Sequence, residues 1–135
     1  MSESNFWKTV KRNLPSDCHA TRIENRHGGG IPDVHIVLNG FSFWIELKVC
    51  KGNKVNLSLE QNAWNSAYCR KGGISFILAK HHSEGSLYLF EGNRCSELLD
   101  NGLRTMNLYF GKDYKELFSV IRDFGSEKIG SGREK

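Results

Sequence analysis

The stretch GIPDVHIVLNGFSFWIELKV, residues 30–49, decides the fold because two β-rich runs flank the pair Asn39-Gly40. An Asn-Gly pair between such runs is typical of a two-residue hairpin, since both residues tolerate positive φ angles. We therefore predict antiparallel strands over residues 33–38 and 41–49. A turn at this pair also sets the register of the hairpin. Two residues face each other across it when their numbers sum to roughly 79.

Alternation along the second strand separates two faces of the hairpin. One face is wholly apolar and is assigned to the core: Phe41, Phe43, Ile45, Leu47 and Val49. The other face carries Ser42, Trp44, Glu46 and Lys48. The predicted register places Asp33 opposite Glu46, shortly after the glycine-rich loop HGGG at 27–30. Two carboxylates and a lysine are therefore expected to meet at one end of the hairpin.

The segment after the hairpin predicts a helix that crosses the sheet. Ser58 and Gln61 have the spacing of a capping box, so the helix begins there and runs to Arg70. Its expected buried stripe is Leu59, Ala63 and Ala67. Strands over 74–80 and 86–92 follow, and the first is apolar enough to be central. A crossing helix makes the strands before and after it parallel, so the sheet is mixed.

The two ends of the chain are predicted to be helical. Pro15 ends an amphipathic helix over 3–14, and a strand over 19–26 leads into the glycine loop. After a short helix at 96–99, a last helix begins near Asp113, with the stripe Tyr114, Leu117, Phe118, Ile121 and Phe124. We predict an α/β fold, a mixed β-sheet flanked by helices. A single domain is expected over 1–125, with a flexible tail over 126–135.

Composition argues against several classes of function. The 135 residues suit one domain, and their net charge of +4 is compatible with a nucleic-acid partner. No apolar run approaches the ~18 residues of a membrane span, and the N-terminal region lacks the apolar core of a signal peptide. We therefore expect a cytoplasmic protein. The four cysteines form no CxxC pair, which argues against a zinc knuckle or a redox motif.

The pairing of Asp33 with Glu46 favours a divalent cation, because two close carboxylates repel each other until positive charge lies between them. Mg²⁺ prefers carboxylate oxygens and leaves further positions for water and phosphate. Lys48 beside the cation would orient the attacking water and neutralise charge on the phosphate. Alone, Glu46 and Lys48 would be read as a solvated charge pair. With Asp33 and the glycine loop they indicate metal-assisted hydrolysis of a phosphodiester.

The elements GIPD at 30–33, ELK at 46–48 and LSLEQ at 57–61 together resemble the PD-(D/E)XK nuclease superfamily, and in particular its VRR-NUC branch. Archaeal Holliday-junction resolvases share this core, and the resemblance covers approximately residues 20–80. It implies a restriction-endonuclease-like fold with an α-β-β-β-α-β core, and Mg²⁺ or Mn²⁺ as cofactor. By this resemblance, the metal is held by Asp33, Glu46 and the carbonyl group of Leu47.

The resemblance also implies roles for further residues. Lys48 matches the catalytic lysine, and Gln61 matches a glutamine that opens the next helix and faces the active site. Capping of the helix would by itself explain Gln61. An additional acid is expected near the metal, either Glu24 on the preceding strand or Glu3 of the first helix. The predicted catalytic residues are thus Asp33, Glu46, Lys48, Gln61 and Glu24.

DNA is the expected partner. The candidates for contacts with its phosphates are Arg22, Arg26, His27, Lys51 and Lys54. Trp44 lies on the face of the site and either stacks on a base or packs under the first helix. We favour an endonuclease that acts on branched or junction DNA as a homodimer, with the interface in the strand over 86–92 and the last helix. The alternatives are an exonuclease or a sequence-specific nuclease of the same superfamily, and an inactive nucleic-acid-binding module.

Overall fold

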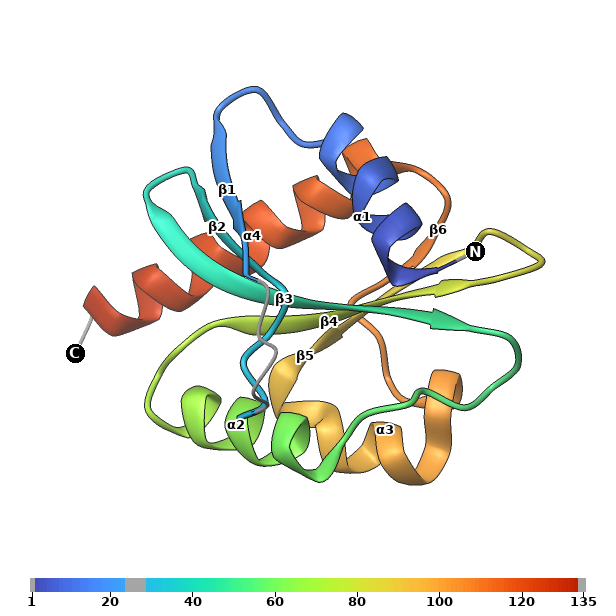
Figure 1. The fold of residues 1–135 in the computed structure, drawn as a ribbon. Helices are drawn as coiled ribbons and strands as arrows, with labels where there is room; N and C mark the ends of the chain where they lie inside the picture. The colour runs from blue at the N-terminus through green and yellow to red at the C-terminus, as the bar shows by residue number, and fades with distance from the viewer. Residues whose placement is uncertain (1, 24–28, 134–135) are drawn as a thin grey trace.

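Six strands form one β-sheet within residues 2–23 and 29–133, the parts of the chain that a computed structural model describes (Figure 1). Helices and 3₁₀ turns, labelled η, connect and cover these strands. In chain order the elements are α1 (Glu3–Arg12), β1 (Cys18–Arg22), β2 (Val34–Leu38), β3 (Phe41–Cys50), α2 (Leu59–Arg70), β4 (Ser75–His81), β5 (Leu87–Glu91), η1 (Gly92–Arg94), α3 (Cys95–Asn101), η2 (Gly102–Arg104), β6 (Tyr109–Gly111) and α4 (Tyr114–Arg133).

The strands lie in the order β1-β2-β3-β4-β5-β6, so each strand is next to its neighbours in sequence. Only β3 and β4 are parallel, and α2 makes the connection between them. The mixed sheet and the crossing helix predicted from sequence are therefore confirmed. The short edge strand β6 was not predicted, because three residues are too few to show an alternating pattern.

The hairpin of β2 and β3 has the predicted turn and register. Asn39 and Gly40 have φ angles of 54° and 83°, the positive values that a type I′ turn requires at both positions. Val34 pairs with Ile45, and Leu38 pairs with Phe41. This register holds Asp33 at the entry to β2, level with Glu46 of β3.

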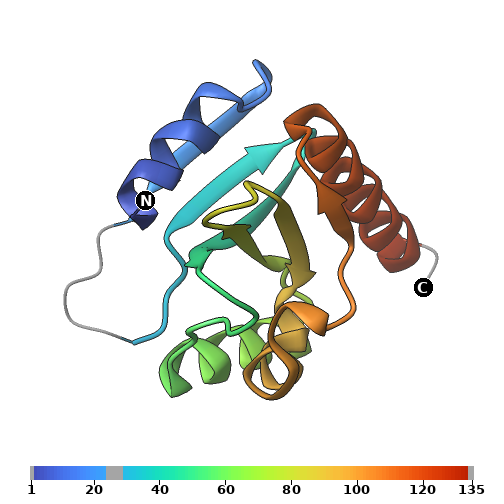
Figure 2. The same ribbon diagram turned by 90° about the vertical axis from the view of Figure 1, so that its right-hand side faces the viewer.

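Helices cover both faces of the sheet (Figure 2). α1 and α4 lie on one face and bury the larger core, which includes Phe6, Ile36, Phe43, Leu78, Leu89 and Ile121. α2 and α3 lie on the other face, where a second core includes Cys50, Val55, Ile77, Phe90 and Leu98. No helix in the described residues is long and apolar enough to cross a membrane. The apolar face predicted for β3 belongs to the larger core.

The last helix is longer than predicted. α4 continues to Arg133, so residues 126–133 extend the last helix, and the flexibility expected of them stays a prediction. Gly125, which suggested the end of the helix, is buried where a Cβ atom would overlap the ring of Phe41. Ile129, one turn further, packs against the core. Glycine at 125 therefore permits close packing, and the domain limits given above stay a prediction.

The inward face of α2 also differs from the prediction. The capping box of Ser58 and Gln61 is present. However, Leu59 is 77% exposed, and Ala63 and Ala67 are exposed as well, so the predicted apolar stripe faces solvent. Asn65 is the buried residue of this helix. α2 therefore turns a polar stripe toward the sheet, and the reason lies in the polar residues of β3 and β4 beneath it.

The surfaces proposed for a dimer interface lie largely within the fold. β5 pairs with β4 on one side and with β6 on the other, so it has no free backbone edge. In α4, Leu117, Phe118 and Ile121 are at most 2% exposed and pack into the larger core. These residues stabilise the protomer, whereas Tyr114 and Phe124 of the same helix are half-buried, so the interface stays a prediction. The homodimer itself stays a prediction.

Candidate active site

The site forms where β3 extends beyond β2. The two strands pair only as far as Ile45, which leaves the backbone of later β3 residues without a strand partner on that side. The side chain of Asp33 accepts a hydrogen bond from the N–H of Leu47 at 2.9 Å. The side chain of Glu3, from α1, accepts one from the N–H of Val49 at 3.4 Å. Two carboxylates thus occupy the edge that a longer β2 would have covered.

The carbonyl group of Leu47 lies on the same side of β3 as Asp33. In an antiparallel ladder, the N–H and C=O groups of one residue face the same neighbour. Because the N–H of Leu47 bonds to Asp33, its carbonyl oxygen also faces the side where β2 has ended. The oxygen expected as a metal ligand is therefore next to the first predicted carboxylate.

Glu46 points to the α2 side of the sheet and is only 3% exposed. Its Oε2 atom accepts a hydrogen bond from Nε2 of Gln61 at 3.2 Å and lies 3.7 Å from Nζ of Lys48. Its Oε1 atom is buried and has no hydrogen-bond partner among the described residues. Three of the predicted catalytic residues are thus in direct contact, and one carboxylate oxygen is left unsatisfied.

Burial raises the pKa of Glu46 to about 9, and the nearby charge of Asp33 adds to this effect. The positive charge of Lys48 lowers the pKa of Glu46, but this effect is smaller than the effect of burial. Two carboxylates in a poorly solvated place cannot both be ionised at low cost. The cluster therefore lacks positive charge, which a bound cation would supply.

Gln61 serves the helix and the site at the same time. Its Oε1 atom accepts a hydrogen bond from the N–H of Ser58, and its own N–H donates to Oγ of Ser58. The cap thereby fixes the side-chain amide so that its NH₂ group is turned to Glu46. The interpretation of Gln61 as a cap and its expected orientation toward the site are both correct.

A buried polar network behind Gln61 was missed by the sequence analysis. Nδ2 of Asn65 donates to the carbonyl of Gln61 at 2.8 Å, and Oγ of Ser75 on β4 donates to Oδ1 of Asn65 at 2.7 Å. Both Asn65 and Ser75 are fully buried. Gly92 lies against them so closely that a Cβ atom would overlap Oγ of Ser75. The sequence did contain one sign of this network. Asn65 follows Gln61 by one helical turn and therefore lies on the same face of α2.

Gly30 packs onto the first turn of α2. Gly30 has a φ angle of +77°, and a Cβ atom there would overlap the carbonyl group of Glu60. Only glycine allows both this backbone conformation and this approach. The loop therefore brings Asp33 back toward the start of α2. The predicted residues Glu24, Arg26 and His27 lie outside the described residues.

The donor atoms of this cluster fit Mg²⁺. A hard cation prefers the oxygen donors of carboxylates and carbonyls, and the orphaned Oε1 of Glu46 offers one such donor. Asp33 and the carbonyl of Leu47 are the adjacent ones. No group of three or more His, Cys, Asp or Glu side chains in the described residues converges as a metal site, so Glu3, Asp33 and Glu46 do not form a complete ligand set by themselves.

The other predicted contact residues lie around the cluster. Arg22 is exposed at the end of β1, where its Nη2 atom is 3.4 Å from Oγ of Ser4. Lys51 and Lys54 are exposed in the loop that follows β3. Trp44 lies on the α2 face, where it meets the ring of Trp64. The alternative in which Trp44 packs under the first helix is therefore wrong.

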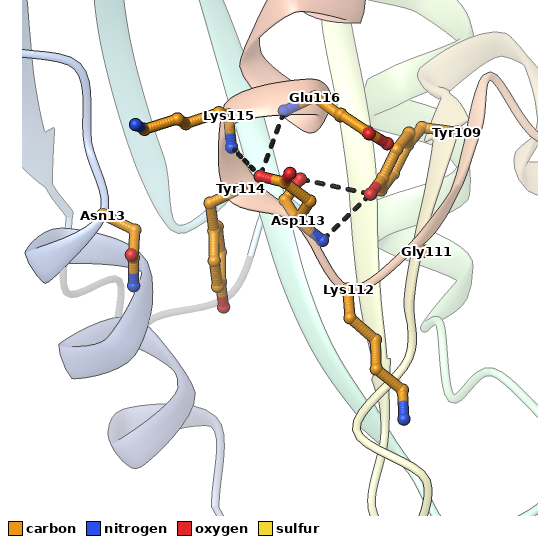
Figure 3. A pocket seen from close by; sticks show the side chains of 8 residues that line it. All are labelled: Asn13, Tyr109, Gly111, Lys112, Asp113, Tyr114, Lys115 and Glu116. Carbon is orange, nitrogen blue, oxygen red and sulfur yellow. Dashed lines mark hydrogen bonds between the residues drawn. The ribbon is translucent and has the colours of Figure 1, made fainter.

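A hollow of about 640 Å³ lies away from this cluster, between the end of α1, β6 and the start of α4 (Figure 3). Asp113 caps α4 there by accepting from the N–H groups of Lys115 and Glu116. The hydroxyl of Tyr109 bonds only to the backbone of Asp113. The charged ends of Lys112 and Lys115 point in different directions. These groups maintain the turn and assemble no reactive cluster.

Cysteine chemistry is also disfavoured. All four cysteines are unpaired. Burial raises the pKa of Cys50 to about 11 and that of Cys95 to about 12, so both thiols stay protonated at neutral pH. Neither is a nucleophile, and the acidic cluster of Asp33 and Glu46 is left as the candidate active site.

The structure is similar to that of Hjc, a Holliday junction resolvase from Archaeoglobus fulgidus, an archaeal hyperthermophile. The similarity covers 67% of this chain and 74% of that chain, with a TM-score of 0.50 and 16% sequence identity. The sequence matches no protein-family model and none of the curated proteins with which it was compared. At this identity the similarity shows the fold. The chain has the restriction-endonuclease-like fold, a mixed sheet flanked by helices, as predicted.

Proposed function

We propose that this chain is a Mg²⁺-dependent endonuclease that hydrolyses phosphodiester bonds of DNA and selects branched or junction DNA. One observation carries the proposal: Glu46 is buried beside Asp33, contacts Lys48 and Gln61, and keeps one oxygen without a partner among the described residues. A protein that only bound DNA would gain nothing from a buried and a half-buried carboxylate close to phosphates. The similarity in fold to a Holliday junction resolvase supports the choice of substrate.

Each residue of the cluster has a distinct role in this proposal. Asp33, Glu46 and the carbonyl of Leu47 would hold Mg²⁺, or Mn²⁺ in its place. When bound, the cation supplies positive charge to the oxygens of the scissile phosphate. Lys48 orients the attacking water and stabilises negative charge on the phosphate. Gln61, fixed by the helix cap, holds the carboxylate of Glu46 in position.

Glu3 is our candidate for the additional acid. Its carboxylate reaches the free edge of β3 through the N–H of Val49, two residues beyond the N–H that Asp33 occupies. Its charge also contributes to the raised pKa of Glu46. Glu24 stays the alternative given by the sequence. A homodimer would supply the two paired nicks that a junction requires, and sedimentation equilibrium would measure it.

Cleavage assays test the proposed reaction. We expect the protein to cut a four-way junction faster than the matching linear duplex in Mg²⁺ and to cut neither in EDTA. Asp33→Asn or Glu46→Gln should lower the rate at least 10²-fold, because each removes a metal ligand. Glu97→Gln is the matched control, since Glu97 is exposed and pairs only with Arg94 on the surface. Full activity of Asp33→Asn or Glu46→Gln in Mg²⁺ would overturn the assignment.

Lys48 should act on the reaction and leave metal binding intact. Lys48→Ala removes a positive charge 3.7 Å from Glu46, so we expect Mn²⁺ affinity in calorimetry to stay equal or increase. The cleavage rate at saturating metal should nevertheless fall at least 10²-fold. A variant that loses Mn²⁺ binding but cleaves normally once metal is saturating would contradict this role.

A further inference from the structure

Four rings form a continuous row on the α2 side of the sheet, and we call His35, Trp44, Trp64 and Tyr68 the aromatic row. The rings of His35 and Trp44 are opposite each other in the hairpin, with centroids 4.8 Å apart. Trp44 meets Trp64 edge to face at 5.8 Å, and Trp64 stacks on Tyr68 at 4.7 Å. All four side chains are half-buried, so each presents part of its ring to solvent.

The aromatic row begins at the acidic cluster. Trp44 precedes Glu46 by two residues on the same face of β3, a distance of about 7 Å along the strand. On α2, which runs beneath β3 and β4 (Figure 1), Trp64 and Tyr68 follow Gln61 at the i+3 and i+7 positions. These seven residues correspond to about 10 Å of helix. The row therefore leads away from Glu46 and Gln61 along one stripe.

The polar ends of the two indoles and the phenol form no hydrogen bond with any residue that the structure describes. In the described part of the chain, no hydrogen bond involves the indole N–H of Trp44 or Trp64 or the hydroxyl of Tyr68, and none of these atoms is buried without a partner. Rings that serve only to fill a core are fully buried, as Phe43 and Phe76 are. Buried tryptophan and tyrosine usually find a hydrogen-bond partner. The row therefore has the character of a binding surface.

Charge around the aromatic row favours an anionic ligand. The segments that carry it, residues 34–45 and 62–73, contain no Asp or Glu. Arg70 and Lys71, at the end of α2, are both exposed. A surface that combines half-exposed rings with positive charge, and that lies beside a candidate cation site, suits a chain of nucleotides, which has both bases and phosphates.

We propose that the aromatic row binds unpaired nucleotides of the DNA substrate by stacking on their bases, directly next to the phosphate that is cleaved. The proposal rests on the nuclease function and specifies its substrate. Bases in a duplex already stack on one another, so a ring surface beside the site selects nucleotides outside a duplex. Every base has a π face, so this recognition requires no particular sequence.

Binding without metal tests the proposal. A short fluorescent oligothymidylate is compared in EDTA with an abasic oligomer of the same length, which keeps the phosphates and lacks the bases. We expect the oligothymidylate to bind at least about fivefold more tightly. The double variant Trp64→Leu, Tyr68→Leu should reduce the ratio of the two affinities, oligothymidylate over abasic oligomer, to near one. Its affinity for the abasic oligomer should stay unchanged. Trp64→Phe, which keeps a ring, should retain most of the ratio.

Phe110→Leu is the matched control, because Phe110 is 55% exposed on the edge strand β6 and lies outside the aromatic row. It should leave the ratio unchanged. Equal binding of the two oligomers by the wild-type protein overturns the proposal, whether or not the double variant folds. A ratio that survives in a folded double variant, as judged by circular dichroism, also overturns it.

The failure of this proposal and that of the nuclease proposal are distinguishable. The binding assay contains no metal and measures no cleavage. A protein that cuts junctions in Mg²⁺ but binds both oligomers equally is a nuclease without the stacking surface. A protein that prefers the oligothymidylate but never cuts in Mg²⁺ has the stacking surface, and the nuclease function is then wrong.

Discussion

At the scale of single residues, Glu46 is a carboxylate that the fold holds in an unfavourable place. It is almost fully buried, it has Asp33 as a neighbour, and one of its oxygens has no partner in the described part of the protein. Burying a charge without sufficient compensation lowers stability. We infer that ionisation of Glu46 strains the metal-free protein, and that a bound cation would relieve this strain.

The pKa of Glu46 makes this strain measurable. The pKa is about 9 in the folded protein and near 4.5 in an unfolded chain, so the folded state holds the proton more tightly. This group therefore stabilises the fold fully below about pH 4.5, and the stabilisation is lost as pH rises toward 9. In EDTA, the free energy of unfolding by urea should fall by at least about 1 kcal/mol between pH 6 and 9.

Two variants test whether Glu46, and not another titrating group, causes the pH dependence of the free energy of unfolding. Glu46→Gln cannot ionise, so its unfolding free energy should change much less over the same range and exceed that of the wild-type protein at pH 9. Glu97→Gln, at an exposed surface pair, should keep the wild-type decline. If Glu46→Gln declines as steeply as the wild-type protein, the raised pKa of Glu46 is not the cause.

At the scale of elements, α2 determines how the acidic cluster is oriented. Its inward stripe contains Gln61, Asn65 and Cys69 at successive turns, and this stripe meets Ser75 of β4. A helix with this polar face gains little from apolar burial, so hydrogen bonds must fix it on the sheet. The amide of Asn65 links the first turn of α2 to β4 and thereby holds Gln61 against Glu46.

Asn65→Ala tests this link. The variant leaves the carbonyl of Gln61 and the hydroxyl of Ser75 without their buried partner, so we expect the free energy of unfolding to fall by about 1–3 kcal/mol. The cleavage rate at saturating Mg²⁺ should also fall, because Gln61 loses its support. We then compare the loss of cleavage rate that Gln61→Ala causes in two backgrounds. The loss should be smaller in the Asn65→Ala variant than in the wild-type protein.

The control for Asn65 is Asn107→Ala, because Asn107 is exposed in the segment before β6. This change should alter neither stability nor rate. Fully additive effects of Asn65→Ala and Gln61→Ala on the rate would contradict a role of Asn65 that acts through Gln61.

At the scale of the whole molecule, basic residues lie on different sides of the acidic cluster. Lys51 and Lys54 follow the end of β3, and Arg22 lies at the end of β1. Lys112 and Lys115 belong to the separate hollow beside α4. A DNA strand that reaches Glu46 would therefore contact the first group of cations and not the second.

The salt dependence of DNA binding distinguishes the two groups. Each phosphate contact adds about 0.9 to the slope of log affinity against log salt. Replacing Lys51 and Lys54 together by alanine should therefore reduce the slope by up to about two units in a junction-binding assay with Ca²⁺. Replacing Lys112 and Lys115 together by alanine, an equal change of charge, should leave the slope unaffected. Equal effects of the two pairs would show that only net charge matters.

The central hairpin and the meeting of its charged residues follow from the sequence alone. Asn39-Gly40 fixes the turn, and the turn fixes the register, so Asp33 and Glu46 must lie at the same level of the sheet. Both steps depend on neighbours along the chain and on the two-residue period of a strand. The capping box of α2 is equally local, which is why the position of Gln61 was predictable.

Which surfaces face each other depends on the tertiary structure. α2 turns Asn65 inward and Leu59 outward because it lies over Glu46 and Ser75, and hydrophobicity alone predicts the reverse. Gly125 continues a helix because the ring of Phe41 lies against it. Glu3 reaches the site because β2 ends early and leaves the edge of β3 open to α1. Each outcome depends on a partner distant in sequence, and the local pattern contains no information about that partner.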